Sequence, residues 1–168
     1  MNDEQEIRDL ITRWLRLSAE GDIAQIVPLM TEDVVFLVGG QPPMRGRDAF
    51  AASFAGWRGK FRLETNCEIQ EIQTNGDLAY SWTKLSVTMT PVDGGPANRR
   101  SGYTLTVLRK NADGAWQIFR DANLLVPEVA ETQSVPASPH TDLKSMPLFL
   151  NGLCLNPHPR FSSDTAIH

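Results

Sequence analysis

The spacing of hydrophobic and polar positions changes near Gly59 from mainly helical to strand-like. Before this residue, apolar side chains recur at intervals of three and four positions, which is typical of one buried face of an α-helix. Beyond it, they lie in runs rich in β-branched and aromatic residues, which is typical of strands. The first part predicts helices over residues 3–21, 22–29 and 47–57, with a strand over 33–38.

Turn sequences divide the second part of the chain into further strands. Asn75-Gly76-Asp77, Gly94-Gly95-Pro96 and Asn111-Ala112-Asp113-Gly114 have the composition of hairpin turns. The expected strands cover residues 61–73, 78–90, 99–110 and 115–126. Helices followed by a meander predict the α+β class, with three N-terminal helices packed on one face of a curved antiparallel sheet.

The composition shifts again at Pro127. Six of the eleven prolines and all three histidines lie beyond residue 126. We therefore expect one domain over residues 1–126 and a Pro-rich tail over 127–168, partly extended or docked on the domain.

Charge and composition exclude several kinds of partner. The formal net charge of −4 comes without a basic run, so nucleic acid and anionic membranes are not expected partners. No apolar run reaches the roughly 18 residues of a membrane span, and the N-terminus is polar, so we expect a cytoplasmic protein. Cys67 and Cys154 fit neither a disulfide framework nor a metal site, and we expect no metal.

Five short segments carry a family resemblance by their order and spacing. They are RWL at 13–15, AEGD at 19–22, LMTEDVVF at 29–36, MRGRDA at 44–49 and DGAWQI at 113–118. Together, from about residue 3 to 126, they resemble the SnoaL-like and ketosteroid-isomerase-like branch of the nuclear transport factor 2 superfamily. The resemblance implies a cone-shaped fold with a ligand pocket between helices and sheet. It also implies a dimer formed through the outer face of the sheet.

The residues of a steroid isomerase are missing from this pattern. The resemblance places Trp14 where a phenol would stand, Val38 near the base, and Thr104 near the acid. An indole lacks the acidity of a phenol and a valine cannot accept a proton, so the isomerase mechanism is excluded. Residues 1–126 contain no histidine, which argues against histidine catalysis. We expect no cofactor.

Asp121 is the principal candidate for catalysis. Alternation in the last strand places it on one face with Gln117, Phe119 and Asn123, and the resemblance suggests that this face lines the pocket. A carboxyl group among apolar neighbours has a raised pKa and can act as a general acid or base. The alternative is a surface or ion-paired aspartate, and a one-residue bulge would turn it outward.

Aromatic residues offer either a ligand-binding wall or an ordinary core. Trp14, Trp57, Tyr80 and Trp82 form this group, and the resemblance turns Tyr80, Trp82 and the neighbouring Lys84 toward the helices.

Three further residues belong to this predicted ligand site. Thr104 and Asn123 would supply hydrogen bonds, and Phe119 would line the same wall of the pocket. An inward Lys84 is costly unless it reaches the rim or pairs with Asp121.

The opposite face of the last strand predicts an interface. Trp116 and Ile118 would lie outward, and Tyr103, Leu105 and Val107 would extend the same surface. Apolar outward residues on a sheet favour a homodimer.

Two functions remain open. The first is a domain that binds a small apolar organic molecule, with or without cofactor-independent acid/base activity. The second is a cyclase-, isomerase- or dehydratase-type enzyme that uses Asp121 as general acid/base. The loss of the isomerase residues favours the first.

Overall fold

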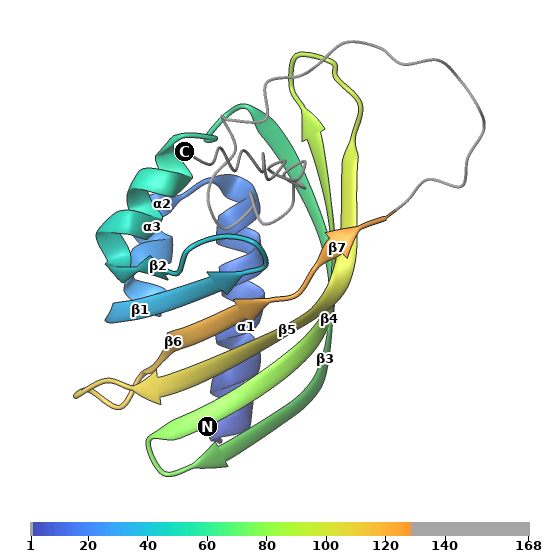
Figure 1. The fold of residues 1–168 in the computed structure, drawn as a ribbon. Coiled ribbons are helices and arrows are strands. Elements are labelled where there is room, and N and C mark those ends of the chain that lie inside the picture. Colours follow the sequence, from blue (N-terminus) through green and yellow to red (C-terminus); the bar gives the residue numbers. More distant parts are fainter. Residues whose placement is uncertain (1, 129–168) are drawn as a thin grey trace, which may run out of the picture.

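The computed structural model describes residues 2–128 and shows helices gathered on one side of a strongly curved sheet (Figure 1). The N-terminal part contains α1 (Asp3–Glu20), α2 (Ile23–Ile26), a 3₁₀ turn (Val27–Leu29), β1 (Met30–Val38), β2 (Met44–Arg45) and α3 (Gly46–Ala55). The strands that follow are β3 (Phe61–Asn75), β4 (Leu78–Pro91), β5 (Asn98–Lys110), β6 (Trp116–Asn123) and β7 (Val126–Pro127).

The sheet order is β2-β1-β6-β5-β4-β3, and β7 pairs with β5. Neighbouring strands are antiparallel except β1 and β6, which run parallel. The long strands β3 to β5 bend around α1 (Figure 1). The expected α+β class, with three N-terminal helices and a curved sheet in a cone-shaped arrangement, is confirmed.

The local sequence explains where α1 begins and ends. The Asn2 side chain accepts a hydrogen bond from the Gln5 backbone N–H at 2.8 Å, which caps the first turn. Gly21 adopts φ 74°, in the left-handed region that favours glycine, and its N–H bonds to the Leu17 carbonyl. Asp22 then caps α2 by accepting from the Gln25 N–H. The chain is thereby turned back so that α1 lies across the sheet.

A chain of aromatic rings fills the space between the helices and β1. Trp14 stacks on Phe36 with ring centroids 5.9 Å apart, and Phe50 lies 5.2 Å from Phe36. The chain continues through Phe54 to Trp57, whose side chain is almost fully buried. These contacts fix α1 and α3 against β1 and close one end of the cone.

A β-bulge interrupts β6 at Phe119. Leu108 of β5 pairs with Ile118 and the adjacent Val107 pairs with Arg120, so Phe119 is an extra residue. The bulge shifts the alternation by one residue, so even-numbered positions before it and odd-numbered positions after it share the inner face. Trp116 and Ile118 are therefore buried in the core at 5% and 4% exposure, which corrects their predicted outward position.

The predicted tail lies almost wholly outside the described residues. Within the described part, Val126 and Pro127 pair with Ser101 and Arg100 of β5. The extended or docked arrangement predicted for the remainder therefore stays a prediction.

Candidate functional site

A pocket of about 110 Å³ lies between α1 and the inner face of the sheet. This is somewhat below the ~150 Å³ of an engineered cavity that holds benzene. Its apolar lining comprises Leu10, Ile11, Trp14, Leu15, Phe36, Val38, Leu63, Leu85, Val87 and Ile118. Its polar lining comprises Ser18, Thr65, Cys67, Thr83, Thr104, Thr106, Asp121 and Asn123. The pocket is thus of a size for a single ring, with polar groups at selected points.

Asp121 enters the pocket from β6, just beyond the bulge. It pairs with Phe36 of β1 on one side and with Thr106 of β5 on the other. Thr106 Oγ1 donates a hydrogen bond of 2.6 Å to Asp121 Oδ2. Asp121 is partly exposed as a residue because it lines the cavity, while its carboxyl group itself is largely removed from water.

Burial sets the acidity of this carboxyl group. Removal from water raises the pKa of Asp121 from its ordinary value of 3.8 to about 6, and the hydrogen bond from Thr106 opposes part of this rise. Asp121 is the single charged residue among the described residues that line the pocket. With no cation there to favour the ionised form, the carboxyl group can both accept and release a proton near neutral pH.

Hydroxyl, amide and thiol groups surround the carboxyl group on the sheet. Thr83 Oγ1 and Thr104 Oγ1 share a hydrogen bond of 2.8 Å, and Asn123 Oδ1 accepts from the Leu125 N–H at 3.0 Å. Burial raises the pKa of the Cys67 thiol, although a hydrogen bond with Thr83 lowers it in part. Cys67 is therefore a neutral thiol at neutral pH.

The family model of the SnoaL-like domain matches residues 1–120. The chain belongs to the SnoaL-like domain family. This confirms the resemblance seen in the sequence.

Three solved structures are similar to this SnoaL-like domain. A conserved protein from Planctomyces limnophilus is 35% identical with TM-score 0.72, over 75% of this chain and 98% of that one. A ketosteroid isomerase-like protein from Erwinia carotovora atroseptica is 25% identical with TM-score 0.65, over 77% and 100%. A candidate scytalone dehydratase from Novosphingobium aromaticivorans shares the fold at 16% identity and TM-score 0.68, over 82% and 92%. No curated protein matches the chain significantly.

The SnoaL-like domain brings four of the predicted site residues into the pocket. They are Trp14, Thr104, Asp121 and Asn123. Trp57 lies elsewhere, in the aromatic core, with its ring centroid 4.6 Å from that of Phe54. It is a core residue and does not line the pocket.

The predicted inward orientation of Tyr80, Trp82 and Lys84 is wrong. In β4 the buried positions are Ala79, Ser81 and Thr83, and the three predicted residues alternate with them on the outer face. The physical reason is a carboxylate on that face. Glu71 accepts hydrogen bonds from Tyr80 Oη at 2.9 Å and from Trp82 Nε1 at 2.8 Å, which satisfies both polar groups outside the core.

The suggested pair of Lys84 and Asp121 is also wrong, because the sheet separates the two side chains. Lys84 is exposed on the outer face, whereas Asp121 lines the pocket on the inner face. The carboxyl group therefore keeps Thr106 as its hydrogen-bond donor.

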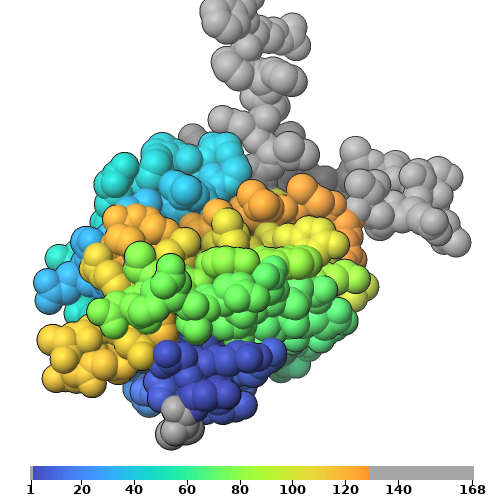
Figure 2. All heavy atoms as spheres, turned by 90° about the horizontal axis from the view of Figure 1, so that it is seen from below, coloured from blue at the N-terminus to red at the C-terminus, as the bar shows by residue number. Residues whose placement is uncertain are grey.

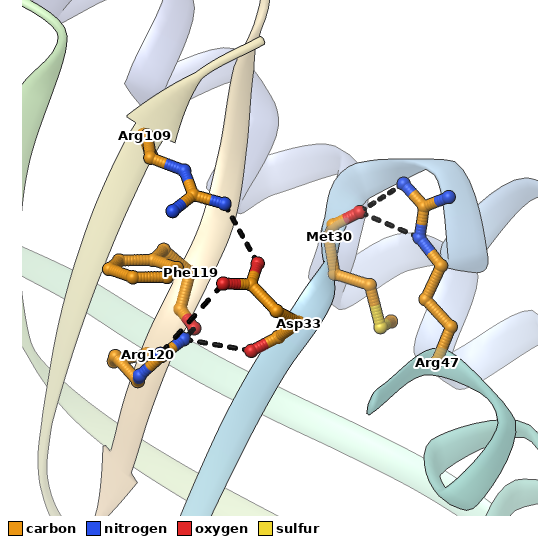
Figure 3. Close-up of polar contacts among 6 residues, drawn as sticks. All are labelled: Met30, Asp33, Arg47, Arg109, Phe119 and Arg120. Atoms are coloured by element: carbon orange, nitrogen blue, oxygen red, sulfur yellow. Dashed lines mark hydrogen bonds and ion pairs between the residues drawn. The ribbon is translucent and has the colours of Figure 1, made fainter. Parts of the chain in front are cut away.

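Phe119 is displaced from the predicted wall by the bulge. Its ring lies between two guanidinium groups, 4.0 Å from Arg109 and 3.7 Å from Arg120 (Figure 3). Asp33 contacts both arginines, at 2.7 Å to Arg109 and 4.0 Å to Arg120. These cation–π and ionic contacts hold Phe119 away from the pocket. In the same view, Arg47 of α3 donates to the Met30 carbonyl at the start of β1.

Sequence reasoning missed several pocket residues, namely Ser18, Phe36, Cys67 and Thr106. Ser18 had a local signal, because it follows Ile11, Trp14 and Leu15 at helical spacing and is polar in an apolar stripe. The others depend on how α1 crosses the sheet. Residues 2–128 hold no cluster of three metal-ligating side chains. None of their helices has the length and apolar character of a membrane span.

Proposed function

We propose that this SnoaL-like domain binds a small, mostly apolar organic molecule in its pocket and exchanges a proton with it through Asp121, without a cofactor. The observation that carries this proposal is the position of a lone carboxyl group inside a largely apolar cavity. Such a group has a pKa near the pH at which an enzyme works, as the value of about 6 for Asp121 illustrates.

The surroundings of Asp121 favour its action as a base toward a carbon–hydrogen bond. At pH 7 most of the population is ionised, and the carboxylate has left bulk water, which makes it a stronger proton acceptor. The other polar groups nearby are hydroxyls, such as those of Thr104 and Thr83, which are weak donors. This combination suits isomerase- or lyase-type chemistry that needs a single carboxylate base. It suits a reaction in which little negative charge develops on the substrate, because the hydroxyl groups could stabilise only a small charge.

A generic proton-abstraction reaction tests this proposal without knowledge of the natural substrate. In 5-nitrobenzisoxazole, a base removes the proton on the ring carbon, the N–O bond breaks, and a coloured cyanonitrophenolate forms. We expect the protein to accelerate this reaction, with a rate that rises with pH through about 6 as Asp121 ionises. Asp121→Asn should lower the rate by roughly 10²-fold or more.

The control is Asp93→Asn, which removes an exposed carboxylate of the β4–β5 loop and should leave the rate unchanged. Binding of the probe is measured separately by calorimetry. If the wild-type protein and Asp121→Asn bind the probe equally and convert it at equal rates, the domain is a binder whose carboxyl group does no chemistry.

One observation favours that second candidate, a binding domain without catalysis. Trp14, Val38 and Thr104 line the pocket, and none can replace the ionisable groups that the isomerase pattern requires. Native mass spectrometry of the purified protein tests for binding alone. A retained small molecule that is released on unfolding supports a ligand pocket.

We also propose a homodimer formed through an outer-face patch, which we define as Leu37, Tyr80, Trp82, Tyr103 and Leu105. Trp82 pairs with Leu105, and Leu105 and Leu37 both neighbour Ala122, so the patch runs across β4, β5, β6 and β1. Leu37, Tyr80, Tyr103 and Leu105 are 46%, 38%, 51% and 44% exposed. Figure 2 shows β3, β4 and β5 (green to yellow) side by side on one surface. Contiguous exposed apolar and aromatic side chains favour association.

A further inference from the structure

We propose that Ser18 is a second polar contact for the ligand, and that the pocket therefore selects a molecule with hydrogen-bonding groups at two places on an apolar body. This inference rests on the proposed function, because it names the class of molecule that the same pocket takes. The two contacts lie on opposed walls, Asp121 on the sheet and Ser18 on α1.

The observation behind it is an unsatisfied hydroxyl group. Ser18 is only 9% exposed and lines the pocket, and its Oγ has no hydrogen-bond partner in the described part of the chain. Serine within a helix commonly satisfies its hydroxyl group by donating to the carbonyl of residue i−4, as Thr12 does with Arg8 at 2.9 Å on the exposed side of α1. Ser18 forms no such bond.

An unsatisfied buried hydroxyl group is costly to the empty protein. Alanine at the same position would avoid this desolvation penalty and would also favour the helix more. The neighbours of Ser18 on the pocket wall, Ile11, Trp14 and Leu15, are apolar and offer no hydrogen bond in its place. A ligand group that reaches Ser18 Oγ would remove the penalty.

The chemistry of the walls narrows the ligand class. Since Asp121 is the single charged side chain among the described lining residues, an anionic ligand would meet repulsion and no cation. Trp14 and Phe36 offer aromatic surface, and the volume of about 110 Å³ suits one ring. The favoured ligand is an uncharged ring-sized molecule with two hydroxyl or carbonyl groups, one for each wall.

A matched pair of probes tests the role of Ser18. para-Propylphenol and tyrosol have nearly the same shape and differ by a terminal methyl or hydroxyl group on the side chain. Dissociation constants for both are measured by calorimetry with the wild-type protein and with Ser18→Ala. We expect the ratio of the two constants to change by about fivefold or more on substitution, against tyrosol, since a hydrogen bond contributes about 1 kcal/mol.

Leu15→Ala, on the same wall, is the control and should weaken both probes while leaving their ratio unchanged. Thermal unfolding of the empty proteins provides a second readout, in which Ser18→Ala should be at least as stable as the wild type. An unchanged ratio with Ser18→Ala, or a variant clearly less stable than the wild type, overturns the role of Ser18 while ligand binding stands. If the wild-type protein binds neither probe, this inference fails together with the ligand class on which it depends.

Discussion

The inner and outer faces of one sheet each hold a carboxylate among aromatic side chains, and the pKa values of the two carboxyl groups are shifted in opposite directions. Burial raises the pKa of Asp121 to about 6 on the inner face. On the outer face, hydrogen bonds from Trp82 and Tyr80 hold the pKa of Glu71 below its ordinary value. The difference in pKa comes from the removal of Asp121 from water and from the number of hydrogen bonds that each carboxyl group accepts. Both groups have aromatic neighbours, so aromatic surroundings alone do not set the direction of the shift.

The two faces also differ in what they leave unsatisfied. On the outer face, the polar groups of Tyr80 and Trp82 are both bound by Glu71, and the outer-face patch exposes apolar and aromatic side chains beside them. On the inner face, the Ser18 hydroxyl group has no partner in the described chain, and Asp121 receives a single side-chain donor. The inner face therefore suits a small polar-ended molecule, and the outer face suits a protein surface.

The largest expected effect is a difference in the free energy of unfolding between matched substitutions on the two faces. Leu108→Ala removes a fully buried side chain from the inner face and should lower the free energy of unfolding by about 2–5 kcal/mol. Leu105→Ala, three residues earlier on the same strand and 44% exposed, should cost under about 1 kcal/mol at protein concentrations too low for association. Urea denaturation measures both, and equal losses would contradict the assignment of the two faces.

The second prediction uses the two carboxylates. Asp121→Asn should stabilise the protein above pH 6, because the native state no longer holds a buried charge, by up to roughly 3 kcal/mol for a shift from 3.8 to about 6. The wild type binds a proton in the folded state before the unfolded state does, so the gap narrows as pH falls from about 6 to about 4.

Glu71→Gln is the matched substitution on the outer face and should act in the opposite sense. Since the folded-state pKa of Glu71 is lowered, its stabilising contribution is present above the unfolded value of 4.5 and is lost as pH falls through the folded value. The variant should be less stable than the wild type at pH 7 and equal to it in acid. Thermal unfolding across pH checks both curves, and two curves of the same sign would refute the contrast.

The third prediction concerns association. Leu105→Lys places a charge in the outer-face patch and should weaken the proposed dimer roughly tenfold or more, about 1.4 kcal/mol, while leaving the fold intact. Sedimentation equilibrium gives the association constant, and circular dichroism confirms the fold. A wild-type protein that is monomeric at high concentration would rule out this use of the outer face.

The smallest expected effect is on Cys67, whose thiol lines the pocket. Because burial raises its pKa, alkylation at pH 7.5 should be slower than for free cysteine, and para-propylphenol should slow it further. The measurement uses a Cys154→Ser background so that one thiol reports. Rates equal to those of free cysteine, unaffected by the probe, would show that Cys67 is open to solvent.

Local sequence signals predicted the fold well because its elements are bounded by local chemistry. The helical spacing with Gly21 as its end, and the hairpin turns at Gly76 and Gly114, each act within a few residues. The two-residue strand β2 (Met44–Arg45) had no such signal, because it forms only by pairing with Val35 and Phe36 of β1.

The site was harder to predict, because alternation defines two faces of a strand without saying which one is buried. In β4 the aromatic Tyr80 and Trp82 suggested an inward face, whereas Val87 and Met89, which are buried, belong to the alternate set. Those residues were the better signal. Whether Ser18 or Cys67 lines the pocket depends on the crossing of α1 over the sheet, which no local pattern records.

The bulge at Phe119 lets the length of this strand change without moving the acidic group. Because Leu108 pairs with Ile118 and Val107 pairs with Arg120, a deletion of Phe119 would leave both pairings in place and restore strict alternation. Asp121 would still lie opposite Thr106 on the inner face. A lineage can therefore lose one codon at this point and keep the acidic group, and an alignment gap in this strand is no sign that the site has been lost.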